Sequence, residues 1–97
     1  MTPEEAKQKL SACRGEIDDI DRRLVALLNE RSRVVERIGQ VKQQVSMPVY
    51  EPKREDEVYA NIEAANHGPI SKDALRRIFE RIIDEMRTLQ RTRMEGK

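Results

Sequence analysis

Residues 24–42 read LVALLNERSRVVERIGQVK, and this stretch decides the fold because it belongs to one long apolar helix face. Apolar residues recur every seven positions on both sides of it, and no proline interrupts residues 4–47. Two interleaved series carry the period: Leu10, Ile17, Leu24, Ile38 and Val45, and Cys13, Ile20, Leu27, Val34 and Val41. The pattern predicts a single long helix. Thr2 is its expected cap, Pro3 its first residue, and Glu5 completes a capping box with Thr2.

The remaining chain contains two turn signals and two shorter helices. Residues 46–52, SMPVYEP, contain two prolines and are predicted to end the long helix. A second helix is expected over residues 52–65, followed by a turn at residues 66–69, NHGP. Ser71 is the predicted cap of a third helix, and Gln90 lies on the apolar face of that helix, four residues after Met86. The fold class is therefore all-α, with one long helix and two shorter ones.

Length and composition limit the classes of function. The 97 residues are expected to form a single domain, residues 1–97, and the net charge of +1 gives no reason to expect a nucleic-acid or membrane surface. Cys13 is the only cysteine, and no apolar run is long enough for a signal peptide or a membrane span. We therefore expect a cytoplasmic protein. About 40 helical residues span roughly 60 Å, which is more apolar helix face than a compact monomer of this length could shield from water. The long helix therefore predicts a second copy of the chain.

Two cations lie on or beside the apolar face. Arg31 replaces an aliphatic residue of the first series, and Lys42 follows eleven residues later, about 16 Å along the helix. Arg31 could fix the register or lie at the surface, but two long cations on nearly one face could also bind a small anion. Arg14 is about 25 Å before Arg31, so it could reach the same anion only from an antiparallel partner; otherwise it pairs with Asp18.

A second group of polar residues lies on the two shorter helices. Glu51 and Glu55 extend the apolar stripe of the second helix, and Arg54 adjoins Glu55. They could form a solvated cluster at a helix start or part of a site. Gln90 is either bonded within a buried face or exposed at the end of its helix. His67 lies in a turn without a partner and is not expected to be a base or a metal ligand.

This set of residues favours a particular kind of chemistry. It contains cations, carboxylates and one amide, but no activated nucleophile, no phosphate-binding loop and no metal-ligand spacing. Such a site suits a small polyanion. It can catalyse a reaction by holding a flexible substrate in a reactive conformation and by donating hydrogen bonds where negative charge develops.

Three segments in order resemble a known family, the all-helical (AroQ) class of chorismate mutases. They are CRGEIDDIDRRLVALLNERSRVVERIGQVK at residues 13–42, MPVYEPKRE at 47–55 and RIFERIIDEMRTLQ at 77–90. Six residues match the active-site pattern of the family in order: Arg14, Arg31, Lys42, Arg54, Glu55 and Gln90.

The resemblance implies an intertwined homodimer in which helices of both chains form the bundle. Each of two sites would take Arg14 from the partner. It also implies conversion of chorismate to prephenate, in phenylalanine and tyrosine biosynthesis, without a cofactor or a metal. Arg14 and Arg31 would then bind the side-chain carboxylate, and Arg54 the ring carboxylate.

The same resemblance assigns the remaining site residues. Glu55 would accept a hydrogen bond from the ring hydroxyl, with help from the backbone at Glu51. Lys42 and Gln90 would donate to the ether oxygen. Met86 departs from relatives that have a small polar residue there, which implies one substrate contact fewer.

Two other functions remain open. An isochorismate pyruvate lyase on the same fold would share most of the cations, although an acidic residue at position 55 favours chorismate. A regulatory or dimerisation domain could instead associate with another enzyme of aromatic biosynthesis.

Overall fold

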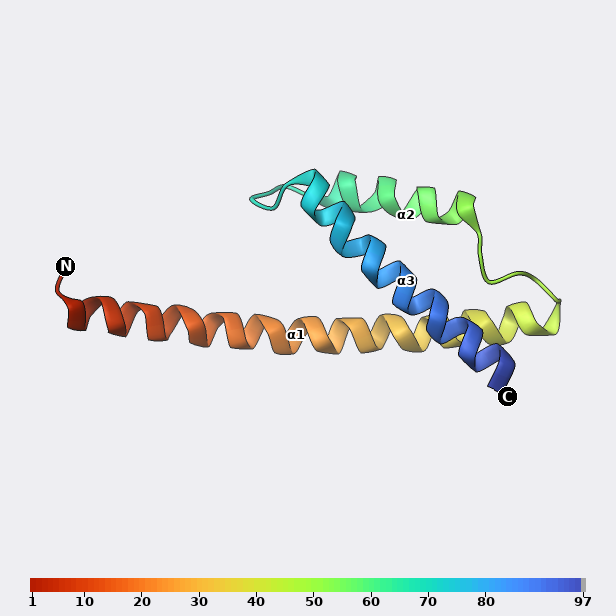
Figure 1. Cartoon of the computed structure of the whole chain (residues 1–97), viewed down its shortest axis with the longest axis horizontal. Coiled ribbons are helices and arrows are strands. Elements are labelled where there is room, and N and C mark those ends of the chain that lie inside the picture. The colour runs from red at the N-terminus through yellow and green to blue at the C-terminus, as the bar shows by residue number, and fades with distance from the viewer. Residues whose placement is uncertain (97) are drawn as a thin grey trace. The chain divides into compact units, whose positions relative to one another are not determined.

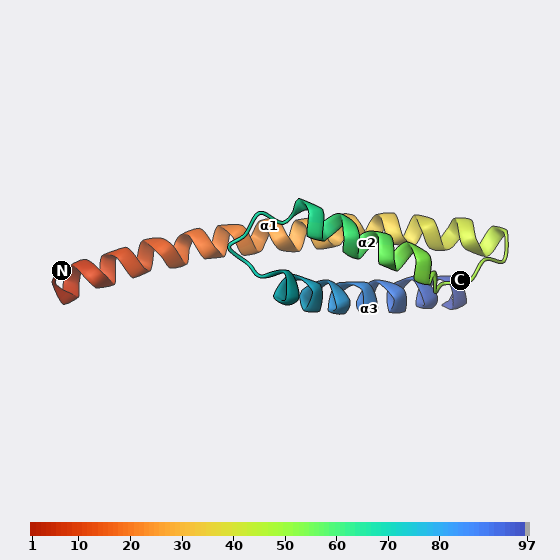
Figure 2. The ribbon, with the colours of Figure 1, turned by 90° about the horizontal axis from the view of Figure 1, so that it is seen from above.

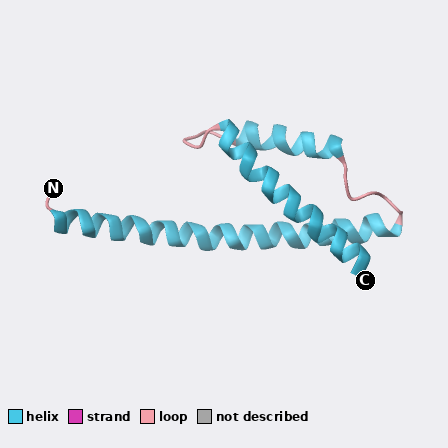
Figure 3. Ribbon diagram, viewed as in Figure 1, coloured by secondary structure: helices cyan, strands magenta, loops and turns pink. Residues whose placement is uncertain are grey.

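The chain folds into three helices, as the sequence predicts. The computed structural model describes residues 1–96, and within them α1 spans Pro3–Gln44, α2 spans Pro52–Ala65 and α3 spans Lys72–Gly96. No strand occurs in these residues (Figures 1 and 3). The all-α class with one long and two shorter helices is confirmed. None of the helices, over the part of the chain described, is long and apolar enough to cross a membrane.

The structure divides into two compact units, Met1–Arg33 and Val34–Lys97, each of which is described by itself. The first unit consists of most of α1. Its start is the predicted capping box, because the Thr2 N–H donates to Glu5 Oε1 at 3.3 Å and the Glu5 N–H donates to Thr2 Oγ1 at 3.1 Å. Its large apolar side chains are exposed: Leu10, Ile17, Ile20, Leu24, Val25, Leu27 and Leu28.

α1 ends in the second unit, where backbone hydrogen bonds terminate the helix. Ser46 has a φ of 57°, in the left-handed region. The Met47 N–H then donates to the Lys42 carbonyl at 2.8 Å, and the Ser46 N–H reaches the Gln43 carbonyl at 3.5 Å. This is the Schellman arrangement, in which a left-handed residue ends a helix. It ends α1 at Gln44, just before the segment that contains Pro48.

The two shorter helices form a hairpin within the second unit (Figure 2). Pro52 is the first residue of α2, where a missing N–H does no harm. In the turn, Gly68 has a φ of 76° and its N–H donates to Asn66 Oδ1 at 3.0 Å. Ser71 Oγ then accepts from the Ala74 N–H at 3.1 Å and caps α3. The predicted turn and cap are both confirmed.

The buried residues of the second unit lie on α1 and α3. The buried apolar residues are Val35, Ile83 and Met86. Two polar residues, Lys42 and Gln90, are buried with them. Because burying a charge is costly unless it has partners, the surroundings of Lys42 indicate where the chemistry of this unit lies.

Candidate active site

Lys42 is the centre of the candidate site. It is 6% exposed, and its ammonium group has three oxygen acceptors. Nζ donates to Gln90 Oε1 at 3.0 Å and to the Val49 carbonyl at 3.0 Å, and it forms an ion pair with Glu51 Oε1 at 2.7 Å. An ammonium has three N–H donors, so all three have partners. We call these four residues the Lys42 cluster.

Gln90 joins the Lys42 cluster from α3, 48 residues away along the chain. The predicted alternative, an exposed end of α3, is wrong at this position because Gln90 is only 7% exposed. Its Oε1 accepts from Lys42, which leaves the Nε2 group of the same amide as a donor. Lys42 and Gln90 thus place a cation and an amide donor side by side in a buried position.

Glu55 lies on the first turn of α2, where it contacts a residue that the sequence analysis did not select. Arg87 Nη2 donates to Glu55 Oε2 at 2.6 Å, and both side chains are only partly exposed, at 27% and 22%. This bond raises the pKa of the Arg87 guanidinium, which therefore keeps its charge. The sequence offered one indication of this contact, the opposite charges of Glu55 and Arg87. That indication does not select the pair, because a chain rich in Arg and Glu contains many such combinations.

Arg54 does not join this group of contacts. Its side chain is exposed, and Nη1 lies 3.3 Å from Oε1 of Glu57, one turn further along α2. Exposed pairs at this spacing contribute little to stability. Arg54 can therefore change partner at low cost.

Arg14 and Arg31 belong to the first unit. Arg14 is exposed, and within residues 1–96 the ion pair with Asp18 considered above does not form. Arg31 is half-buried. Their roles toward a ligand remain predictions.

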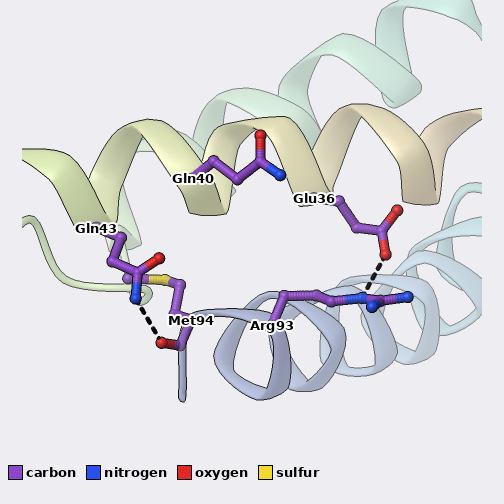
Figure 4. A pocket seen from close by; sticks show the side chains of 5 residues that line it. All are labelled: Glu36, Gln40, Gln43, Arg93 and Met94. Atoms are coloured by element: carbon purple, nitrogen blue, oxygen red, sulfur yellow. Dashed lines mark hydrogen bonds and ion pairs between the residues drawn. The ribbon is translucent and has the colours of Figure 1, made fainter. Parts of the chain in front are cut away.

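A separate pocket lies between α1 and the end of α3, and none of the predicted site residues lines it (Figure 4). Its walls are Glu36, Gln40, Gln43, Arg93 and Met94. Glu36 pairs with Arg93, and Gln43 Nε2 donates to the Met94 carbonyl at 2.7 Å (Figure 4). These contacts hold α3 against α1. The pocket is thus distinct from the Lys42 cluster.

Comparison with known proteins identifies the family. The model of the family "Chorismate mutase type II" matches residues 13–91. The chain belongs to this family. This match contains both Lys42 and Gln90, so the buried contact lies within the type II chorismate mutase region.

Individual relatives agree with this family. The bifunctional chorismate mutase/prephenate dehydratase of Aquifex aeolicus is 34% identical over 88 residues, which cover 87% of this chain and 24% of that protein. The chorismate mutase of Methanocaldococcus jannaschii is 27% identical over 89 residues, 91% of this chain and 90% of that protein. The chain thus spans about a quarter of the fused relative and nearly all of the small one.

A solved structure shares the fold. The chorismate mutase of Thermus thermophilus, in its form II structure, has a TM-score of 0.84 and 35% sequence identity, with 86% of this chain and 94% of that chain covered. The three-helix arrangement is therefore that of a type II chorismate mutase.

Proposed function

We propose that this chain is a chorismate mutase that converts chorismate to prephenate. The observation that carries the proposal is the contact between Lys42 Nζ and Gln90 Oε1, 3.0 Å apart and buried within the family-matched region. In this rearrangement a carbon–oxygen bond breaks while a carbon–carbon bond forms, and negative charge grows on the ether oxygen. Two donors fixed beside that oxygen stabilise the transition state more than the ground state.

Lys42 must release one of its three acceptors to donate to the ether oxygen. Glu51 is the acceptor that can move, because its side chain is 40% exposed whereas the Val49 carbonyl belongs to the backbone. Rotation of Glu51 toward solvent would free one N–H of Lys42. In the absence of substrate, Glu51 thus serves as the counter-ion of a buried cation.

The carboxylates and arginines would hold the rest of the substrate. Glu55 would accept the hydrogen bond of the ring hydroxyl, and Arg54 would exchange Glu57 for the ring carboxylate. Arg31 and Arg14 would bind the side-chain carboxylate. A dianion held at both ends stays in the compact conformation in which the reacting carbons are close.

We propose further that the active form is an intertwined homodimer in which Arg14 comes from the partner. The exposed apolar side chains of residues 1–33 support a partner, because so large an apolar face is unusual for a monomer in water. A second copy would cover this face and place an antiparallel α1 beside the first. We also propose a cytoplasmic location, as expected from the single cysteine.

The experiment that tests the proposed function is incubation of the purified chain with chorismate and, separately, with isochorismate, followed by identification of the products. Prephenate is expected. Salicylate and pyruvate, formed from isochorismate, would instead indicate the lyase. If neither substrate is consumed, a regulatory or dimerisation role is favoured, and the fused Aquifex relative then suggests association with a prephenate-processing enzyme.

A further inference from the structure

We propose that Arg87 positions the Glu55 carboxylate for the reaction, which makes Arg87 a positioning residue of the active site. The inference rests on the proposed function, in which Glu55 accepts the hydrogen bond of the ring hydroxyl. Arg87 does not touch the substrate in this arrangement. It acts through Glu55.

The geometry of the pair gives the two oxygens of the Glu55 carboxylate different roles. Arg87 Nη2 holds Oε2 of Glu55 at 2.6 Å, a charge-assisted hydrogen bond between α3 and α2. Oε1 of Glu55 is then left to accept from a substrate hydroxyl. A carboxylate held by one oxygen cannot rotate freely, so the other oxygen keeps a fixed direction.

Arg87 is itself fixed by contacts on two further sides. Its Nη1 lies 3.3 Å from Oδ1 of Asp84, and its guanidinium lies over the Tyr50 ring, 5.1 Å from the centroid. Tyr50 is in the segment that supplies Val49 and Glu51 to Lys42. Arg87 therefore contacts both Glu55 and the segment, residues 49–51, that supplies two members of the Lys42 cluster.

One feature of Arg87 argues against a purely stabilising role. Its Nε is buried and has no hydrogen-bond acceptor within the described residues. A buried donor without an acceptor costs stability. An apolar side chain of similar length would avoid that cost, so the value of arginine at this position lies in what it does to Glu55.

The chain contains a matched pair that serves as a control. Arg76 of α3 also pairs with a glutamate of α2, Glu63, at 3.5 Å, and it lies over the Tyr59 ring at 4.0 Å. It has the same three chemical groups as the arrangement of Arg87, Glu55 and Tyr50. Within the described residues, no hydrogen bond or ion pair joins Arg76 or Glu63 to the Lys42 cluster.

The test begins with steady-state kinetics of wild type, Arg87→Met and Arg76→Met on chorismate. We expect Arg87→Met to lower kcat by about 10- to 100-fold, the range expected when a reacting group is misplaced. KM should change much less, because Arg87 does not contact the substrate. Arg87→Lys should recover part of kcat, since an ammonium can donate one bond to Oε2. Arg76→Met should stay within about twofold of wild type.

A double-mutant cycle then separates positioning from general structural support. If Arg87 acts through Glu55, adding Arg87→Met to Glu55→Ala, which removes the acceptor altogether, should change kcat by less than about twofold. If the loss of kcat in the double variant equals the product of the two single losses, the inference is overturned. The same conclusion follows if Arg87→Met has the kcat of wild type, or if Arg76→Met loses as much activity as Arg87→Met.

Failure of the proposed function and failure of the inference can be told apart. If wild type forms no prephenate, the proposed function fails and the role of Arg87 fails with it. If wild type is active and Arg87→Met is also fully active, only the inference fails. Should Arg87→Met not fold, as judged by circular dichroism, Arg87→Leu, which also lacks a donor, replaces it in the same cycle, with the same criteria.

Discussion

Gly39 of α1 lies directly against Gln90 of α3. A Cβ atom added at Gly39 would come within 3.1 Å of the Gln90 Cγ and within 3.6 Å of the Gln90 carbonyl oxygen. The absence of a side chain at Gly39 thus lets α3 approach α1 closely enough for the Gln90 amide to reach Lys42. The glycine is required here by a close approach between helices and not by its φ angle.

Gly39→Ala should push Gln90 away from Lys42. The crowded methyl group is expected to cost about 1–3 kcal/mol of unfolding free energy, which the higher helix propensity of alanine offsets by about 0.5–1 kcal/mol, and to lower kcat by at least about tenfold, since Gln90 is displaced. Gly15→Ala is the matched control, because nothing lies within 4 Å of its added Cβ. That change should stabilise α1 by about 0.5–1 kcal/mol and leave kcat unchanged. Urea unfolding and steady-state kinetics of both variants measure these effects. A Gly39→Ala variant with wild-type kcat would contradict the close-approach argument.

Lys42→Ala should lower kcat by two or more orders of magnitude, about 3 kcal/mol or more of transition-state stabilisation, while KM changes much less. The reason is that the bond to the ether oxygen strengthens as charge develops. The fold should survive at some cost in stability, because Glu51 is exposed enough to be hydrated but the buried Gln90 Oε1 loses its donor. Lys53→Ala, at an exposed position of α2, is the control and should retain full activity. Near-normal kcat in Lys42→Ala would exclude the assigned role.

Glu55→Gln should reduce kcat less than Glu55→Ala. The amide oxygen of glutamine can still accept the hydrogen bond of the substrate hydroxyl, although without the charge, whereas alanine removes the acceptor. Kinetics of the two variants at saturating chorismate compare these cases. Equal losses in both variants would indicate that the charge of the carboxylate matters and its hydrogen bond does not.

The unfolding midpoint should rise with protein concentration if the chain is a dimer. Dimerisation couples folding to association, so mass action favours the folded state at higher concentration. Thermal unfolding followed by circular dichroism over a hundredfold range of concentration measures this dependence. A midpoint that stays constant over that range, with a monomer mass by sedimentation, would refute the dimer.

Arg14→Ala and Arg31→Ala homodimers should each be nearly inactive, but a mixture of the two should recover activity. When equal amounts are refolded together, about half of the dimers are mixed, and each has one pocket with both changes and one with neither. Activity should therefore return to about a quarter of wild type. If both arginines serve a pocket of their own chain, every pocket stays defective. An inactive mixture, with subunit exchange confirmed by mass spectrometry, would exclude a cross-subunit role for Arg14.

Helix periodicity placed Lys42 and Gln90 on or beside apolar faces but left open whether Gln90 is buried or exposed. The family resemblance implied that both donate to one oxygen of the substrate, and the structure shows that both are buried and in contact. Pro52 and Ser71 marked the starts of α2 and α3 because their chemistry acts locally.

Features that depend on tertiary geometry could not be predicted in the same way. Arg87 is one of many arginines, and only the packing of α3 on α2 selects Glu55 as its partner. The Val49 carbonyl reaches Lys42 because of the backbone path after Ser46, and no side-chain pattern encodes that path. The burial of Gly39 is likewise visible only once α3 is in place.

The spacing of Arg87 and Gln90 also limits how the gene can change in length. The two residues are one turn apart on α3, yet Gln90 contacts α1 and Arg87 contacts α2. One inserted codon before residue 87 would rotate both side chains by about 100° relative to the preceding part of α3, and both contacts would be lost together. Residues 67–70 of the turn are exposed and belong to no helix, so no helical register fixes their number. Insertions and deletions should therefore be tolerated in that turn and excluded from the stretch of α3 that leads to Gln90.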